Sequence, residues 1–166
     1  MKNNYKNPNT LSFWQKHILN VDSLSENEYI TIDRIKSAVR LIPAKRVKLL
    51  DIGVGYGYLE SALTLRKYDT DLIGIDITRT GLLKVISKYF GSYLVANAVS
   101  LPFRNEMFDV VCLLEVIEHL FSSEAMSALT EIRWVLKNNG RLILSVPLFD
   151  PVFKGHPSGH VREYSP

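Results

Sequence analysis

The chain has 166 residues, of which 46% are hydrophobic, and a formal net charge of +3 at pH 7. This length supports one substantial core and excludes two ordinary domains. The basic residues are scattered, which gives no indication of nucleic acid, and no apolar stretch approaches the roughly 20 residues that cross a bilayer. We therefore expect a single-domain, cytoplasmic protein without a membrane segment.

The first 43 residues are expected to form a helical segment that belongs to the same domain as the core at 44–166. Phe13 and Trp14 begin a short apolar pattern at near-helical spacing, which predicts a helix that either packs on the core or covers the mouth of a site. Ser25 and Glu28 have the spacing of a capping box, which predicts the start of a second, amphipathic helix. Pro43 marks the end of this helix. Its apolar positions are Ile32, Ile35, Val39 and Ile42.

Strands then alternate with helices along the chain. A strand at 47–52 leads through three glycines into a helix that contains Leu59 and Leu63. Further strands are predicted at 72–76, 93–95, 110–114 and 142–146. A helix with Leu82, Ile86, Tyr89 and Phe90 lies between the first two of these strands. Another helix, at 125–136, precedes the last strand; Ser122 or Ser123 caps it, and Gly140 follows its end. The single cysteine, Cys112, lies within the fourth strand, so we expect it to be a small buried hydrophobe in a reducing compartment.

This alternation predicts a doubly wound α/β domain with a mainly parallel sheet, because right-handed crossovers leave few other arrangements. Such sheets bind ligands beyond the carboxyl ends of their strands, where the direction of winding reverses. The glycine turn, Asp76, Asn97 and Glu115 all follow strands, so we expect them at one site. Asp109, at the entry of a strand, is expected to fix a loop rather than to contact a ligand.

The glycine turn indicates which ligand the site binds. Its glycines, Gly53, Gly55 and Gly57, follow the pattern G-x-G-x-G, whereas a dinucleotide site needs a glycine where Tyr58 stands. Asp51 places a carboxylate close to the turn, which would repel a pyrophosphate and attract an ammonium group. A nucleoside with a cationic amino-acid arm fits this pattern better than a dinucleotide.

The segment DIGVGYG, preceded by apolar residues, resembles the first motif of the class I S-adenosylmethionine-dependent methyltransferases. NAVSLPFRNEMFDVV, LLEVIEHL and RWVLKNNGRLILSVP resemble later motifs of the same family, in the same order. The resemblance implies a Rossmann-like fold and S-adenosylmethionine as the cofactor. It also implies cofactor-binding roles for Asp51, Gly53, Gly55 and Gly57 at the methionine part, Asp76 and Ile77 at the ribose, Asn97 and Ala98 at the adenine, and Glu115 beside them.

Two features depart from the family pattern. Asn97 stands where the family usually has an aspartate beside the adenine, and its amide both accepts and donates hydrogen bonds. The sequence given ends at Pro166, shortly after the fifth strand, so we expect it to lack the C-terminal strands usual in the family and to leave a sheet edge exposed. We expect either a truncated product or a cover for this edge, from a partner chain or from a second copy in a homodimer.

The histidines leave the catalytic assignment open. His119 follows the fourth strand and could be either a general base or a histidine with a structural hydrogen bond. His156, His160 and Glu163 could suggest a metal site, but the Pro-Ser-Gly segment between the histidines favours a loop over the site, so no metal is expected. No residue is assigned as catalytic.

The function that these patterns favour is methyl transfer from S-adenosylmethionine to a nucleophile on a small molecule. The alternatives are a non-catalytic partner subunit of a methyltransferase and, less favoured by the glycine spacing, an NAD-dependent oxidoreductase.

Overall fold

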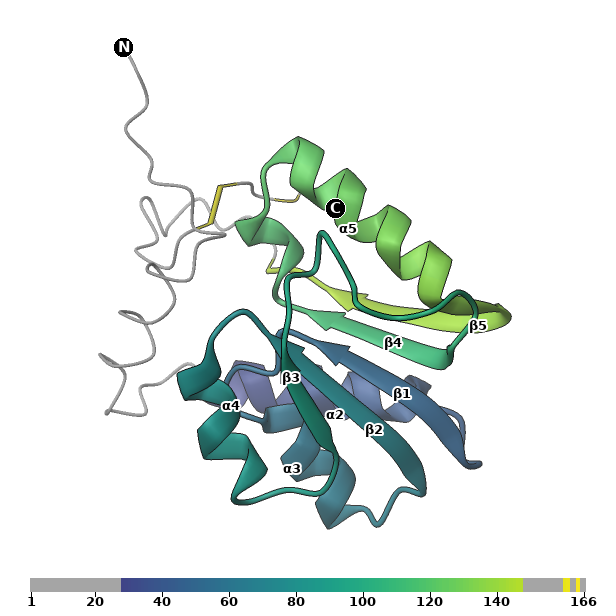
Figure 1. Ribbon diagram of the computed structural model, residues 1–166. Coiled ribbons are helices and arrows are strands. Elements are labelled where there is room, and N and C mark those ends of the chain that lie inside the picture. Colours follow the sequence, from purple (N-terminus) through teal and green to yellow (C-terminus); the bar gives the residue numbers. More distant parts are fainter. Residues whose placement is uncertain (1–27, 148–159, 162–163, 165–166) are drawn as a thin grey trace.

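The computed structural model describes residues 28–147, 160–161 and 164. Five parallel strands form one sheet in the order β3-β2-β1-β4-β5 (Figure 1). The strands are β1 (Val47–Ile52), β2 (Thr70–Asp76), β3 (Ser92–Val95), β4 (Phe108–Leu114) and β5 (Leu136–Ser145). The helices are α2 (Glu28–Leu41), α3 (Tyr58–Leu65), α4 (Arg79–Ile86) and α5 (Ser122–Val135), with the short 3-10 helix η1 (Ile117–His119).

The helices cover both faces of the sheet, which confirms the doubly wound α/β fold. Figure 1 shows α2, α3 and α4 on one face and α5 on the other. The chain runs from β1 outward to β3 and then crosses back to β4, so the winding reverses between β1 and β4. This reversal is where doubly wound sheets bind their ligands.

The central strand β1 supplies apolar side chains to both cores. Leu50 and Ile52 belong to the core that α5 covers, whereas Val47 and Leu49 belong to the core beneath α2 and α3. Side chains alternate along a strand, so Asp51 lies on the same face as Leu49, toward α3. The fold therefore places a carboxyl group inside an apolar layer.

The helix expected around Leu82 is shorter than the sequence suggests. It ends at Ile86, so Tyr89 and Phe90 lie beyond it. Its buried apolar positions are Leu82 and Val85, while Ile86 is 51% exposed. The sequence analysis assigned Ile86 to the buried face in place of Val85, because the two residues are adjacent and similarly apolar.

Both ends of α5 also differ from the prediction. Neither Ser122 nor Ser123 is the N-cap, because the helix starts at Ser122 after Phe121, whose N–H donates to the Glu124 carboxylate at 2.9 Å. The helix ends at Val135, and Leu136 is already extended and pairs with Phe108. Leu136 is buried in the core, which holds it in the sheet rather than in a last helical turn.

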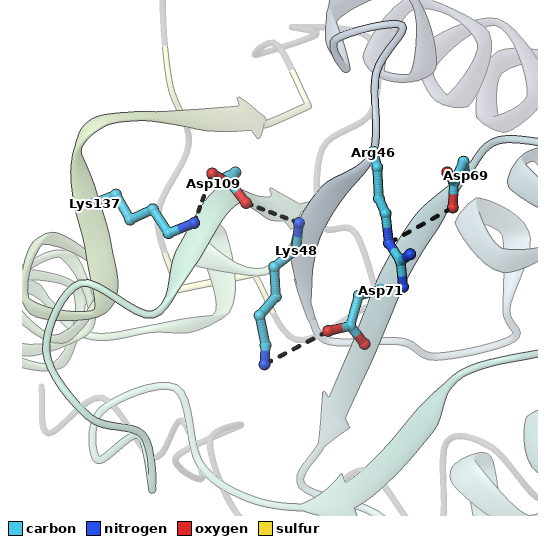
Figure 2. A network of polar contacts seen from close by, with 6 residues as sticks. All are labelled: Arg46, Lys48, Asp69, Asp71, Asp109 and Lys137. Atoms are coloured by element: carbon cyan, nitrogen blue, oxygen red, sulfur yellow. Dashed lines mark hydrogen bonds and ion pairs between the residues drawn. The ribbon is translucent and has the colours of Figure 1, made fainter.

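A polar network lies at the amino ends of the strands, away from the glycine turn (Figure 2). Asp109 accepts hydrogen bonds from the Lys48 N–H at 2.9 Å and from Lys137 Nζ at 2.8 Å, which confirms its expected role as a strand-entry residue. Partial burial raises its pKa, but the bonds from Lys137 and Lys48 outweigh burial, and the net pKa is lowered. Lys48 also forms an ion pair with Asp71 at 3.5 Å.

Several expectations lie outside the described residues: the helix around Phe13 and Trp14, the cap at Ser25, and the segment that contains His156 and Glu163. The unity of residues 1–43 with 44–166 therefore stays a prediction, although Val39 of α2 is fully buried in the core. Cys112 is buried and unpaired within β4, as expected. In the described part of the chain, every helix is too short or too polar to cross a bilayer.

Candidate functional site

The glycine turn joins β1 to α3 and is fixed to the end of β2. The N–H groups of Gly53 and Val54 both donate to the Ile75 carbonyl, at 2.8 and 3.1 Å. Gly53, Gly55 and Gly57 have φ values of 85°, 52° and 77°, a region that L side chains rarely adopt. The backbone conformation therefore accounts for the three glycines that the sequence singled out.

Gly55 differs from Gly53 and Gly57 in the space around it. A Cβ atom at Gly53 would lie 2.5 Å from a methyl of Val116, and one at Gly57 would lie 2.9 Å from the Tyr89 ring. At Gly55 the nearest atom would be the Gly53 carbonyl oxygen at 3.8 Å, so the space above this residue is open. Gly53 and Gly57 thus serve packing, while Gly55 leaves room for a ligand.

Two carboxyl groups lie buried beneath this turn. Asp51 of β1 is 4% exposed and Glu60 of α3 is fully buried. No N–H or hydroxyl group among the described residues donates to the Glu60 carboxylate, whose polar neighbour is the Asp51 carboxyl. A proton on either carboxyl would allow that group to donate to the other one.

The pKa values follow from this burial. Desolvation, and then the charge of Glu60, raise the pKa of Asp51 well above its usual range. Desolvation raises the pKa of Glu60 to about 7, and the charge of Asp76 adds to the increase. Perturbed carboxyl groups are typical of functional sites, because the fold tolerates their cost where a ligand uses them.

Asp76 ends β2 and organises the backbone around the turn. Its Oδ2 accepts from the Gly55 N–H at 2.9 Å, and its Oδ1 accepts from the N–H and the hydroxyl of Thr78, each at 2.7 Å. A carboxylate has about four acceptor positions, so one of them stays available after these three bonds. Ile77, between Asp76 and Thr78, is half-buried.

The segment after β3 lies beside Asp76. The Ala96 N–H donates to the Asp76 carbonyl at 3.0 Å, which brings Asn97 and Ala98 to the same edge of the sheet. Asn97 Oδ1 accepts from the Val99 N–H at 3.2 Å and so fixes the local turn, and Ala98 is 8% exposed. The amide nitrogen of Asn97 stays outside this bond.

Glu115 follows β4 and connects three elements. Its N–H donates to the Ser145 carbonyl at 3.1 Å, and its Oε1 accepts from the Ser145 hydroxyl at 2.7 Å. Its Oε2 pairs with Arg34 of α2. Glu115 has a φ of 56°, an uncommon conformation for a residue with a side chain, and such conformations concentrate at functional sites.

The sequence-predicted residues thus fall into two groups around the strand ends. Asp51, the glycines and Asp76 form one connected unit, with Asn97 and Ala98 joined to it through the backbone. Glu115 is bound to Arg34 and Ser145, and Val116 links its loop to the turn at Gly53. The sequence analysis missed the roles of four residues that complete these groups: Arg34, Glu60, Thr78 and Ser145.

The comparisons with known proteins agree with this geometry. A family model described as a methyltransferase domain matches residues 50–144, which is more than half of the chain. The chain belongs to this methyltransferase domain family. S-adenosylmethionine is the cofactor of the family, and the class I resemblance of the motifs is confirmed.

Relatives of the chain and solved structures of other proteins are also similar to it in sequence and fold. The ubiquinone biosynthesis O-methyltransferase of Cereibacter sphaeroides is 29% identical over 130 residues, which cover 75% of this chain and 50% of that protein. The YcgJ protein of Bacillus subtilis matches with a TM-score of 0.62 and 28% identity, over 83% of this chain and 63% of that chain. The chain spans about half the length of the curated relatives it matches.

A more distant structure shares the fold alone. Phosphoethanolamine N-methyltransferase 1 of Haemonchus contortus, in complex with phosphoethanolamine and S-adenosylhomocysteine, matches with a TM-score of 0.70 and 18% identity. The match covers 92% of this chain and 34% of that chain.

The residues present fit the family's cofactor. S-adenosylmethionine carries an ammonium and a sulfonium, and the buried Asp51 and Glu60 pair is anionic once it loses its proton. Gly55 leaves an open approach to the backbone. A pyrophosphate would instead meet the charges of Asp51, Glu60 and Asp76, so the same residues disfavour a dinucleotide.

Proposed function

We propose that this protein transfers the methyl group of S-adenosylmethionine to a nucleophile on a small molecule. The observation that carries the proposal is the buried pair of Asp51 and Glu60 beneath a glycine turn that is open at Gly55. This arrangement suits a cationic amino-acid arm. The family membership of the chain supports the same reaction.

Each part of the cofactor has a proposed partner. The backbone of the glycine turn and the Asp51 carboxyl hold the methionine part, with the charge of Glu60 behind it. Asp76 accepts a hydrogen bond from a ribose hydroxyl at its remaining acceptor position, beside Ile77. Asn97 and Ala98 lie along the adenine, where the Asn97 amide bonds a ring nitrogen or the amino group. Glu115 borders the site from the β4 side.

The chemistry asks little of the side chains. The bound cofactor supplies a methyl group that is already activated for transfer to a nucleophile. The chain contributes orientation and exclusion of water, effects worth up to roughly 7–11 kcal/mol when the reacting groups are well aligned. We assign no general base.

Labelling of small molecules tests the proposal. The protein is incubated with cell extract and methyl-labelled S-adenosylmethionine, and untargeted mass spectrometry identifies the labelled products. We expect label in the small-molecule fraction with the native protein and a marked loss with Gly55→Ala. Label confined to macromolecules would contradict the small-molecule part of the proposal.

A second candidate function is a partner subunit of a methyltransferase. The supporting observation is the outer edge of β5, which pairs with β4 alone among the described strands. A groove of about 460 Å³ between α2 and this edge includes Leu41 and Leu144, which are 52% and 41% exposed. A partner chain or a second copy would cover this surface. Cofactor binding without turnover, followed by turnover after a second protein is added, would favour this candidate.

A further inference from the structure

Three side chains with metal-binding atoms meet beyond the end of β4. Glu118 and His119 lie on η1, and His160 comes from the C-terminal segment. One donor atom from each residue lies within 4.8 Å of the other two. The Val161 N–H donates to the Glu118 carbonyl at 2.9 Å, which holds His160 and Val161 beside η1.

Glu118 is the unusual member of this cluster. Its side chain is 1% exposed, and neither carboxylate oxygen has a hydrogen-bond partner among the described residues. A buried carboxylate without a partner is costly, because it loses its hydration and gains nothing in return. A cation between Glu118 and the two imidazoles would remove this cost.

The spacing of the donors is close to that of a metal site. Glu118 Oε1 lies 4.0 Å from His119 Nε2, and the two imidazole rings have centroids 5.0 Å apart at an angle of 65°. Donors around a tetrahedral zinc ion lie about 3.4 Å from one another, given bonds of about 2.1 Å. Movements of about 1 Å or less in each side chain would bring the three donors to that distance.

We propose that Glu118, His119 and His160 bind one divalent transition-metal ion. Two imidazole nitrogens and one carboxylate oxygen suit Zn²⁺ and related ions better than Mg²⁺ or Ca²⁺. Three protein ligands leave a coordination position for water or a substrate oxygen. The three side chains lie at the same end of the sheet as the glycine turn, because η1 follows Val116, which packs against Gly53.

This site differs from the one weighed on the sequence, which grouped His160 with His156 and Glu163. The fold instead brings His160 next to Glu118 and His119 of η1, which lie more than forty positions earlier in the chain. The proposal rests on the donor set and its burial, and it holds whether or not the protein transfers methyl groups.

Metal titration of the full chain tests the proposal. Chelator-treated protein is titrated with Zn²⁺ alone and, separately, with Mn²⁺ alone in a calorimeter. We expect one equivalent of Zn²⁺ to bind, and at least about tenfold weaker binding in Glu118→Gln and in His160→Ala. His17→Ala is the matched control and should bind as the native protein does. Absence of Zn²⁺ binding, or equal affinity in the two ligand variants, would overturn the site.

A measurement on the native protein covers the case in which the variants do not fold. The imidazole signals of the four histidines are followed by nuclear magnetic resonance during addition of Mn²⁺, which broadens signals close to it. We expect the signals of His119 and His160 to broaden first. Unchanged signals of His119 and His160 at Mn²⁺ concentrations that broaden other histidine signals would overturn the proposal.

Discussion

Asp51 and Glu60 are the residues in which stability and function oppose each other. Both carboxyls lie in an apolar layer, where ionisation is costly. Burial raises the pKa of each, and the charge of Glu60 raises the pKa of Asp51 further. A cationic ligand reverses this cost because it stabilises the ionised form. The pair therefore destabilises the free protein, and under the proposed function a bound cation would offset that cost.

The first prediction concerns Glu60 and the free energy of unfolding. Its pKa is about 7 in the folded protein and near the ordinary 4.5 when unfolded, so the folded state binds more protons between these values. The free energy of unfolding therefore falls as pH rises from 4.5 through about 7. Glu60→Gln removes this loss, and we expect the variant to be more stable than the native protein near pH 8 by about 3 kcal/mol.

Urea unfolding across this pH range measures the effect. The two proteins should have similar stability at the acid end, where Glu60 is protonated, and diverge as pH rises. Asp33→Asn changes an exposed carboxylate and serves as the control. We expect its stability to depend on pH as that of the native protein does. A stability of Glu60→Gln that runs parallel to the native curve at every pH would contradict the buried ionisation.

The second prediction concerns cofactor affinity and the same pair. Below about pH 7 Glu60 holds a proton that a cationic ligand must displace, whereas above about pH 7 Glu60 is already ionised. The affinity for S-adenosylmethionine should therefore fall as pH decreases, by up to about tenfold per pH unit. Calorimetry in two buffers of different ionisation enthalpy detects the released proton. A pH-independent affinity with no proton release would count against the pairing.

The third prediction separates the glycines by their surroundings. Gly55→Ala places a methyl group in open space, so we expect at least about tenfold weaker cofactor binding and a stability loss of only about 1 kcal/mol. Gly53→Ala drives its methyl into Val116 and should destabilise the fold by more. Thermal unfolding and calorimetry on both variants check the contrast. Equal losses of stability would contradict it.

At the scale of elements, the sequence predicted the sheet and most of its helices because their signals are local. Apolar runs of strand length, each followed by a helical pattern, are sufficient to specify β1 to β4 and their order of appearance. The α5 to β5 junction was missed because Leu136 fits both patterns, and its pairing with Phe108 is a long-range contact. Helix ends depend on such contacts more than on the residues nearby.

The sequence analysis named only part of the candidate site, for a similar reason. The glycines and the acidic residues can be recognised from their positions directly after predicted strands. Glu60 looks instead like an ordinary acidic residue in the first turn of a helix. Its burial against Asp51 follows from the packing of α3 on β1. Likewise, nothing near His160 in the sequence indicates η1 as its neighbour.

The fourth prediction concerns the network at the amino ends of the strands. Asp109→Ala leaves the Lys48 N–H without its acceptor and removes the bond to Lys137, so we expect a stability loss of about 1–2 kcal/mol with unchanged cofactor affinity (Figure 2). Asp71→Ala removes an exposed ion pair and should cost less than about 0.5 kcal/mol. Chemical denaturation distinguishes the two. A larger loss in Asp71→Ala would contradict this ranking.

At the scale of the molecule, the sheet order explains why the site lies where it does. The winding reverses between β1 and β4, and the loops after these strands, at Gly53 and Val116, meet there. The polar network of Asp109 lies at the other end of the strands and serves the fold alone. The proposed binding site and the stabilising polar network thus lie at opposite ends of one sheet.

The fifth prediction follows from mass action on the whole fold. S-adenosylmethionine at about a hundredfold excess over its Kd should stabilise the protein by about 2.7 kcal/mol, which raises Tm by about 5–10 °C in a domain of this size. Differential scanning calorimetry measures the shift, with Gly55→Ala as the control that should shift less at the same concentration. An equal shift in both proteins would place the ligand away from the turn.

The central claim is that the glycine turn and its buried acids bind a nucleoside with a cationic amino-acid arm. Isothermal titration of the native protein near pH 8 with S-adenosylmethionine and with NADH tests this claim most directly. We predict binding of one equivalent of S-adenosylmethionine and no heat from NADH. Heat from NADH alone would contradict the account.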